Sequence, residues 1–426
     1  PLNKIIIIAG LFIALLILLK FVFRGSRKIK IIILVLLLLL FAFFIIIYKK
    51  RTQHLLNITK NIIFSDYDSK NIYFVKLLKN KEYAEEIIKD INQAKDSIYI
   101  SMYLIEINKN PYNLSNKIIE ALCSAAQRNV KIFVMLDLPA KGENPDLLKK
   151  NTVVKKKLES NNIKVIWDSP NNENHEKIVL IDEKIMYIGN HNWSIASLEY
   201  NEEISLKITS YRFTADILNY FFNIFAETQE NIKELSEVSL LQKELISSDN
   251  LKETGAQSTE NFAGAAEELE NQNIFEREDL IKVTDLQFLP GYMYYFKLRK
   301  ELAAAESSVY INMFLLRYVN ANIKDPVYNL LEILNELNSK GVKIKIVLDR
   351  MLEEENKIVY NFLNERKIPV EFYNGNNTMH TKLVVIDGKK IFCGSHNWTN
   401  SAFNSNREVS VYLESPEITE QLNINF

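Results

Sequence analysis

One segment of this chain occurs twice. Residues 175–182, followed by 189–194, recur 205 residues later as 380–387 and 394–399. Two upstream segments, 97–104 and 130–137, also recur, as 308–315 and 342–349. A period this long indicates a duplicated domain, because the units of solenoid proteins are several times shorter.

Each copy alternates short β-branched runs with amphipathic stretches such as 116–128 and 327–340. This alternation predicts an α/β fold with a largely buried sheet in each half. We place the first half at residues 70–228 and the second at 283–426. Residues 229–282 carry thirteen acidic and five basic residues, which predicts an acidic polar linker.

Composition excludes several other classes of protein. Hydrophobic residues make up 47% of the chain, and Gly and Pro together number 20, so the chain is neither collagen-like nor wholly disordered. The only cysteines, Cys123 and Cys393, are too few for a disulfide framework or a C-x-x-C metal cage. We expect both to be reduced thiols in the core.

The first 51 residues differ from the rest of the chain. They carry nine basic residues and no acidic residue, with apolar runs at 5–19 and 31–48. Each run is close to the length of a membrane-spanning helix, so residues 1–51 are predicted to form a transmembrane hairpin that locates the protein to a membrane. A cleaved signal peptide is the alternative for the first run. The basic residues of the loop and of the outer flanks are equal in number, so the orientation stays open.

The histidines follow the duplication. The chain has five, and four occupy matched positions: His175 with His380, and His191 with His396. In the sequence H-x-K on a strand, the imidazole and the ammonium point to the same face. Each half can therefore present one of each to a shared site, as His175 with Lys177 and His380 with Lys382. Imidazole suits nucleophilic or acid–base work near neutral pH, and an ammonium suits a phosphate oxygen.

Two simpler interpretations compete with this one. A single histidine on an apolar strand is usually a structural residue. Two copies in register, each continuing as Lys-x4-Asp-x6-Gly, favour function instead. A metal site is the second alternative, but the lysine would add a cation to the same face, so we expect no metal.

The paired H-x-K-x4-D segments resemble the signature of the phospholipase D superfamily, over about residues 70–228 and 283–420. The resemblance implies two α/β halves that form one active site and need no cofactor. It implies that one histidine attacks phosphorus to form a phosphohistidine while the other protonates the departing alcohol and then activates water or an acceptor alcohol. Which histidine attacks, and whether the product comes from hydrolysis or transfer, stays open.

The resemblance also implies roles for residues around the histidines. Those expected to hold the non-bridging phosphate oxygens are Lys177, Lys382, Asn192 and Asn397. Glu203 and Glu408 are the candidates for hydrogen bonds that orient the imidazoles.

The remaining matched residues are assigned more conservatively. Asp182 and Asp387 complete the catalytic signature, yet each follows four apolar residues in a strand-ending turn, which favours a structural role. His191 and His396 are expected in loops near the site, without catalytic participation. The matched tryptophans, Trp193 and Trp398, are expected in the core. His54 has no repeat partner and is given no role.

An apolar hairpin followed by two catalytic copies is similar to the layout of bacterial cardiolipin synthases. This favours a phospholipid phosphodiesterase or phosphatidyl transferase, with phospholipid and membrane as its partners and no obligate protein partner. The phrase His-Asn-Trp after each glycine is closer to nuclease-like members, so a membrane-tethered nuclease acting on nucleic acid is the alternative. Near-neutral catalytic halves disfavour it. The two intact motifs disfavour a third possibility, a non-catalytic protein that binds anionic lipids.

Overall fold

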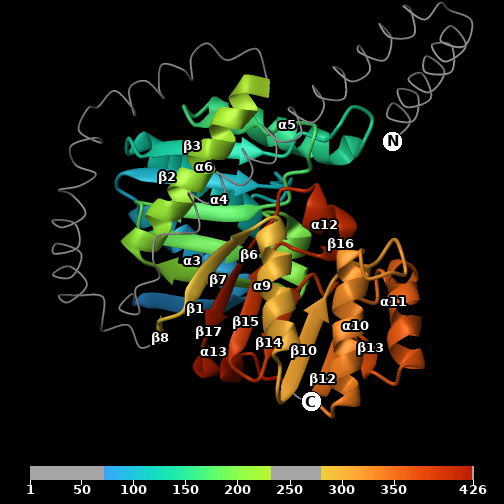
Figure 1. Cartoon of the computed structure of the whole chain (residues 1–426). Helices are drawn as coiled ribbons and strands as arrows, with labels where there is room; N and C mark the ends of the chain where they lie inside the picture. Colours follow the sequence, from blue (N-terminus) through green and yellow to red (C-terminus); the bar gives the residue numbers. More distant parts are fainter. Residues whose placement is uncertain (1–71, 232–279, 425–426) are drawn as a thin grey trace, which may run out of the picture. The chain divides into compact units, whose positions relative to one another are not determined.

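Two similar halves make up the described part of the chain (Figure 1). The computed structural model describes residues 72–231 and 280–424. The transmembrane hairpin expected at 1–51 lies outside these ranges, as does most of the acidic linker expected at 229–282. Within the two described ranges, no helix combines the length and the apolar character needed to cross a membrane.

The first half, coloured blue to yellow-green in Figure 1, contains seven strands of one mixed sheet. Its elements are β1 (Tyr73–Lys79), α3 (Lys81–Gln93), β2 (Ser97–Met102), α4 (Leu114–Gln127), β3 (Lys131–Leu136), α5 (Pro145–Glu159), β4 (Lys164–Trp167), β5 (Lys177–Ile181), β6 (Ile185–Gly189), the π-helix η1 (Ala196–Tyr200), β7 (Ile204–Thr209) and α6 (Tyr211–Asn231). The strands lie in the order β4-β3-β2-β5-β6-β7-β1, and β8 (Ile281–Val283) adds an eighth at the β1 edge.

The second half, orange to red in Figure 1, repeats this arrangement. Its elements are β9 (Leu286–Pro290), α9 (Tyr292–Ala303), β10 (Ser308–Met313), β11 (Leu316–Arg317), α10 (Pro326–Ser339), β12 (Lys343–Leu348), α11 (Glu353–Glu365), β13 (Val370–Phe372), β14 (Lys382–Ile386), β15 (Lys390–Gly394), β16 (Trp398–Thr399), α12 (Asn400–Asn404), β17 (Val409–Glu414) and α13 (Pro416–Gln421). The main sheet has the order β13-β12-β10-β14-β15-β17-β9. The predicted pair of α/β halves is confirmed.

Local sequence explains where the central elements begin and why they are buried. α4 and α10 start within two residues of the expected helices at 116 and 327. The Asn113 side chain accepts from the backbone of Ser115 at 3.0 Å, and that of Asp325 accepts from Val327 at 3.0 Å, so each helix has an N-cap. The two central strands β5 and β14 are buried along their full length, which accounts for their nearly continuous apolar sequence.

The boundary of the second half differs slightly from the expected residue 283. β8 ends at Val283 and pairs antiparallel with β1, with Tyr73 opposite Val283. The chain therefore completes the sheet of the first half before it starts the second.

The repeated glycines Gly189 and Gly394 end β6 and β15, where two strands approach closely. A Cβ at Gly189 would lie 2.2 Å from Ser205 Oγ, and one at Gly394 would lie 2.2 Å from Ser410 Oγ. Only glycine fits such an approach without displacing the neighbouring strand. The next residue, Asn190, donates from its side chain to the Gly394 carbonyl of the other half. The two halves therefore meet where these strands end.

Candidate active site

Backbone hydrogen bonds between the halves bring the two H-x-K segments together. The backbone N–H of His175 donates to the carbonyl of Arg407 at 2.9 Å. In the matching place, the N–H of His380 donates to the carbonyl of Glu202 at 2.9 Å. Each histidine is therefore held beside the residue that precedes a candidate glutamate of the other half.

The glutamates that follow pair with these histidines across the halves. His175 Nδ1 lies 2.9 Å from Glu408 Oε2, and His380 Nδ1 lies 3.0 Å from Glu203 Oε2. All four side chains are buried, and each histidine is less than one tenth exposed. A carboxylate bonded to Nδ1 holds the ring in the tautomer that presents Nε2 to a substrate. The structure thus brings both candidate glutamates to the histidines, in crossed pairs.

The two signature lysines lie beside the same histidines. Lys177 Nζ donates to the His175 carbonyl at 2.8 Å, and Lys382 Nζ donates to the His380 carbonyl at 2.8 Å. Both lysines are 2% exposed. An ammonium has three N–H donors, so each lysine can also donate to the oxygens of a bound phosphate.

Burial in a site that already holds two ammonium groups favours neutral imidazoles. Burial, with Lys177 and Lys382 nearby, lowers the pKa of His175 well below its ordinary value. Burial likewise lowers the pKa of His380 to about 4. Neutral imidazole is the form that can attack phosphorus. A bound phosphodiester anion would offset the ammonium charges and raise the pKa of an imidazole, which favours the protonated form needed for a general acid.

The lysines and the glutamates are also shifted. Burial lowers the pKa of Lys177 to about 8 and that of Lys382 to about 7. Burial raises the pKa of Glu408 to about 7. Burial also opposes ionisation of Glu203, but His380 and its hydrogen bond hold the pKa of that carboxyl below its ordinary value. The site is therefore shielded from water and contains several groups whose charge an incoming anion would change.

The two asparagines expected to bind phosphate follow the glycines closely. The side-chain oxygens of Asn192 and Asn397 are buried and have no hydrogen-bond partner within the described ranges. The backbone N–H of Asn192 donates to Ser197 Oγ at 2.9 Å, so the main chain is held while the amide oxygen is unpaired. Rotation of the amide by half a turn would present its NH₂ group in the same place. These amides keep hydrogen-bonding capacity that a ligand can use.

The two aspartates of the signature lie away from this site. Asp182 Oδ1 accepts from the backbone of Asp96 at 2.8 Å, and Asp387 Oδ1 accepts from that of Ser307 at 2.7 Å. Each aspartate follows a five-residue strand whose first residue is the signature lysine, so it stands at the opposite end of that strand. The prediction that Asp182 and Asp387 belong to the catalytic group is therefore wrong. Their carboxylates accept hydrogen bonds from the backbone of the turns before β2 and β10, which is the structural role that local sequence favours.

The second pair of histidines lies in loops, as expected, but is almost completely buried and has structural contacts. His191 Nδ1 lies 2.7 Å from Ser205 Oγ, and its Nε2 lies 3.1 Å from the Asn80 carbonyl. Its ring stacks on Tyr83, with 4.4 Å between the centroids. His396 has the same contacts with Ser410, Gly291 and Tyr294. Because both ring nitrogens have partners, neither imidazole is available for catalysis.

The matched tryptophans lie in the core, as expected. Trp193 and Trp398 are fully buried. Their Nε1–H groups donate to the hydroxyls of Tyr83 at 3.0 Å and Tyr294 at 3.2 Å.

Sequence reasoning overlooked a pair of buried aspartates that position the histidines. Asp137 accepts from the backbone N–H of Asn174 at 2.7 Å, and Asp349 accepts from that of Met379 at 2.7 Å. Asn174 and Met379 directly precede the two histidines. Burial raises the pKa of Asp137 to about 7. The signal for both aspartates was present, because they end the repeated segments 130–137 and 342–349.

An aromatic residue beside each histidine was also overlooked. The ring centroids of Tyr103 and His175 lie 4.9 Å apart, and those of Phe314 and His380 lie 4.6 Å apart. Lys177 Nζ lies 5.0 Å from the Tyr103 ring, and Lys382 Nζ lies 4.9 Å from the Phe314 ring. These rings help to hold the buried ammonium groups. They differ in one hydroxyl, which is the clearest difference between the two sides of the site.

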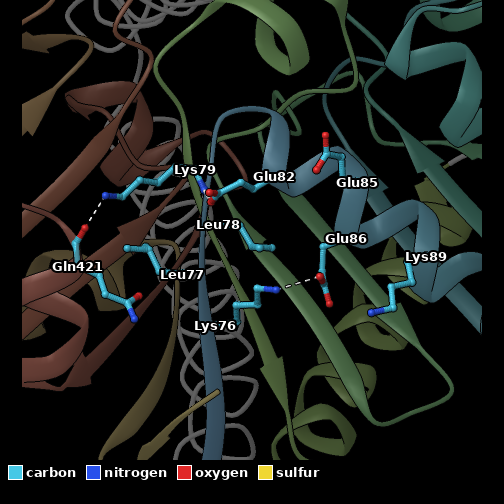
Figure 2. Close-up of a pocket in the computed structure, with 9 residues that line it drawn as sticks. All are labelled: Lys76, Leu77, Leu78, Lys79, Glu82, Glu85, Glu86, Lys89 and Gln421. Atoms are coloured by element: carbon cyan, nitrogen blue, oxygen red, sulfur yellow. Dashed lines mark hydrogen bonds and ion pairs between the residues drawn. The ribbon is translucent and has the colours of Figure 1, made fainter. Parts of the chain in front are cut away.

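Two other features bear on alternative sites. In the ranges 72–231 and 280–424, no three His, Cys, Asp or Glu side chains are grouped so that they could hold a metal ion. Figure 2 shows a surface hollow lined by residues of β1 and α3 and by Gln421 of α13. It contains none of the predicted site residues, and Lys76 in it is paired with Glu86 at 3.0 Å. The hollow is therefore separate from the histidine site.

Several known proteins are similar to parts of the chain. The phospholipase D of Rickettsia conorii is 33% identical over 82 residues, which cover 19% of this chain and 41% of that protein. Cardiolipin synthase A of Buchnera aphidicola is 27% identical over 194 residues, which cover 39% of this chain and 36% of that protein. The chain thus matches about two fifths of the length of these curated relatives.

The fold is shared with a solved structure of low sequence identity. The phosphatidylserine synthase of Haemophilus influenzae has a TM-score of 0.59 and 12% identity, over 83% of this chain and 86% of that one. The family model described as "Cardiolipin synthase, PLD-like domain" matches residues 87–225 and 298–426, which is more than half of the chain. The chain therefore belongs to this family of phospholipase D-like domains, with one match in each half.

Proposed function

We propose that this protein is a phosphodiesterase of the phospholipase D type, which cleaves or transfers the phosphatidyl groups of phospholipids through a phosphohistidine. The crossed pairs of His175 with Glu408 and His380 with Glu203 are the observation that carries this proposal. They supply two oriented imidazoles in one site, and Lys177 and Lys382 lie beside them. Two imidazoles and two cations are the groups that a two-step displacement at phosphorus needs.

In the first step, Nε2 of one histidine attacks phosphorus, and the bond from phosphorus to the alcohol oxygen breaks. The departing oxygen takes a proton from Nε2 of the other histidine. In the second step, that neutral histidine removes a proton from water or from an acceptor alcohol. The activated oxygen attacks phosphorus, the phosphorus–nitrogen bond breaks, and the first histidine is released. Water gives hydrolysis and an alcohol gives transfer.

The lysines and asparagines act on the phosphoryl oxygens. Lys177 and Lys382, whose protonated forms are favoured by a bound phosphate anion, supply positive charge where negative charge develops. Exclusion of water from the site strengthens this interaction. The amides of Asn192 and Asn397 supply further hydrogen bonds. Because these groups belong to both halves, neither half alone contains a complete site.

Similarity and sequence support a lipid as the substrate. The relatives are named as a phospholipase D, a cardiolipin synthase and a mitochondrial cardiolipin hydrolase, the last of which is 31% identical to this chain over 91 residues. The apolar runs at 5–19 and 31–48 support a membrane anchor that keeps the site near lipid headgroups. We expect no cofactor requirement and no obligate protein partner.

The test supplies the detergent-solubilised full chain with labelled phosphatidylglycerol and labelled single-stranded DNA together, with chelator present. We expect phosphatidic acid or a transferred phosphatidyl product, and intact DNA. His175→Ala and His380→Ala should each eliminate the product, whereas Lys389→Ala, on the exposed turn after β14, should not. Cut DNA with unchanged lipid would instead establish a tethered nuclease. Unchanged lipid and unchanged DNA would contradict catalysis on either substrate.

A further inference from the structure

Exposed apolar side chains are concentrated at one edge of the two sheets. Twelve large apolar side chains are exposed within the described ranges. Six of them lie in loops, or in the π-helix η1, at the edge where β5 and β14 begin, which is the edge of the two candidate histidines. We name these six the rim: Ile107, Tyr112, Tyr200, Val319, Ile323 and Met351.

The rim is present in both halves although its sequence is not repeated. Ile107 and Tyr112 lie between β2 and α4, and they are 37% and 78% exposed. Val319 and Ile323 lie between the equivalent elements β10 and α10, and they are 66% and 70% exposed. Isolated exposed apolar residues are ordinary in soluble domains. Apolar tips at equivalent positions of two diverged halves indicate a shared surface.

Hydrogen bonds connect the rim across the boundary between the halves. Asn113, which follows Tyr112, donates from its side chain to Glu199 Oε1 at 2.6 Å. Glu199 directly precedes Tyr200, and the Tyr200 carbonyl accepts from Asn377 of the second half at 2.5 Å. Tyr112 and Tyr200 therefore lie on neighbouring segments, and the segment of Tyr200 contacts the other half.

The same connection continues to Met351. Asn377 Oδ1 accepts from the Tyr373 hydroxyl at 3.1 Å. The Tyr373 carbonyl in turn accepts from Arg350 Nε at 3.1 Å, and Arg350 directly precedes Met351, which is 68% exposed. Hydrogen bonds thus connect the segments of Tyr112, Tyr200 and Met351 along the edge that holds the histidines.

The other exposed apolar residues do not form such a group. Tyr211, at 36%, starts α6 at the opposite edge. Tyr292, at 39%, starts α9 at the histidine edge, and the remaining four lie along α5, α9 and α11. The turns of the opposite edge, such as 128–130, 182–184 and 387–389, expose polar residues instead. The histidine edge therefore exposes apolar loop residues, whereas the opposite edge exposes mainly polar residues to solvent.

We propose that the rim docks on a phospholipid bilayer and inserts its apolar tips among the headgroups, so that a lipid phosphate passes from the bilayer to the histidines. This inference rests on the proposed lipid substrate. His175 and His380 are only 8% and 9% exposed, so a phosphate must pass the surrounding segments to reach them. The tyrosine, isoleucine and methionine tips suit an interface of apolar chains and headgroups. Exposed Lys109, Arg317 and Lys324 lie beside them, and exposed Glu353, Glu354 and Glu355 follow Met351, so the apolar tips rather than net charge carry the proposal.

The first test measures depth in the membrane and needs no turnover. Ile323→Cys receives an environment-sensitive thiol label, and Lys389→Cys, at the opposite edge, is the matched control. The native Cys123 and Cys393 are 9% and 1% exposed, which protects them from the label. The full chain is reconstituted in phosphatidylglycerol and phosphatidylethanolamine vesicles that contain a lipid-borne quencher. We expect several-fold stronger quenching at position 323 than at position 389.

Because both labelled variants keep residues 1–51, anchoring by that segment cannot produce the difference. Equal quenching at the two positions would overturn the docking proposal. A signal at position 323 that responds to single-stranded DNA or to protein concentration, but not to the quencher lipid, would overturn it in favour of another partner.

The second test separates docking from catalysis. The triple variant Val319→Ser, Ile323→Ser, Met351→Ser should lose at least ten-fold in activity on vesicles and keep its activity on a short-chain phospholipid dissolved as monomers. Ile358→Ser, a 53% exposed residue of α11, is the matched control and should be unchanged on both substrates. Equal loss on both substrates would overturn rim docking. If the wild-type chain turns over neither lipid, the proposed function fails, while the quenching result still decides whether the rim docks.

Discussion

The two halves of the molecule agree on the face of the sheet that carries the histidines and differ on the opposite face. On the catalytic face, each half has a histidine bonded to the other half's glutamate, at 2.9 Å and 3.0 Å, and a lysine that donates to the histidine carbonyl at 2.8 Å. The position between histidine and lysine points to the other face of the strand, and there the halves diverge.

In the first half this position is Glu176, a buried residue. Its carboxyl contacts Ser101 Oγ at 2.7 Å and accepts from the hydroxyl of Tyr220, on the 21-residue helix α6, at 2.5 Å. In the second half it is Thr381, whose hydroxyl donates to the Glu202 carbonyl at 3.1 Å, and the corresponding helix α13 has six residues. The face that carries the histidines is therefore the same in both halves, while different packing partners change the other.

The largest effect should come from removing either catalytic imidazole. If the halves act together, His175→Ala and His380→Ala should each reduce kcat by about 10,000-fold, the upper end of what a positioned acid–base group supplies. Circular dichroism should show that both variants remain folded. Substantial activity in both single variants would contradict the shared site, and activity in one alone would show that the halves are unequal.

Exchanging the paired carboxylates should have the next largest effect. Glu203→Gln and Glu408→Gln should each lower kcat by about 100-fold, because the imidazole loses the carboxylate that fixes its tautomer. With nitrogen-15-labelled histidine, Glu408→Gln should move the Nδ1 resonance of His175 and leave that of His380 in place. The reverse assignment would show that pairing occurs within each half rather than across them.

The crossed pairing could not be predicted from the sequence, although its members could. Comparison of the two copies identifies His175, His380, Glu203 and Glu408, because each recurs at an offset of 205. That offset is equally compatible with pairs within a half and with pairs between halves. The backbone hydrogen bonds from His175 to Arg407 and from His380 to Glu202 decide between them, and such contacts depend on docking of two sheets.

Residues can recur in both copies for catalytic or for structural reasons. The repeat alone therefore did not show the roles of the aspartates. Asp182 and Asp387 recur as faithfully as the histidines, but they bond backbone at the far edge of the sheet. Asp137 and Asp349 recur equally well and were overlooked, because nothing in the local sequence shows that they bond the residue before each histidine. Repetition identifies constrained positions, whereas three-dimensional contacts show the constraint.

The face that diverges can be tested through stability. Glu176→Thr gives the first half the residue of the second, and it leaves Ser101 and Tyr220 buried without their carboxyl partner. We expect the free energy of unfolding to fall by about 2–4 kcal/mol. Thr381→Ser keeps its hydroxyl and should lower it by less than about 1 kcal/mol. Urea unfolding in detergent measures both changes. Equal losses would contradict the expectation that the carboxyl of Glu176 contributes more to stability than the side chain of Thr381.

Each buried imidazole should make a contribution to stability that acid removes. The folded-state pKa of His380 is lowered from 6.5 to about 4, so between these pH values the unfolded state binds more protons than the folded state. The contribution of His380 to the free energy of unfolding should therefore fall by about 1.4 kcal/mol per pH unit as pH decreases from about 6.5 towards about 4. Glu408 and Asp137, whose pKa is raised to about 7, contribute with the opposite sign in this range, so the histidine contribution is read from the difference between variants.

His380→Asn should remove one such contribution, and His175→Asn should do the same, because burial lowers the pKa of His175 as well. Urea unfolding at a series of pH values measures the slopes. An unchanged slope in both variants would mean that the imidazoles are not held neutral. A change in one variant alone would show that the two sides of the site differ in charge.

The smallest expected effect concerns the one hydroxyl that separates the aromatic residues of the two sides. Tyr103→Phe makes the first side match the second, where Phe314 occupies the equivalent place. Burial raises the pKa of Tyr103, so its hydroxyl stays protonated, and it accepts from Asn144 Nδ2 at 3.4 Å, a long contact. The ring contacts with His175 and Lys177 survive the change, so kcat/KM should fall by no more than about five-fold, as for loss of one weak neutral hydrogen bond.

Phe314→Tyr is the reciprocal variant. A loss of 100-fold in Tyr103→Phe alone would mean that this hydroxyl contacts the substrate and that the two sides of the site hold different parts of it.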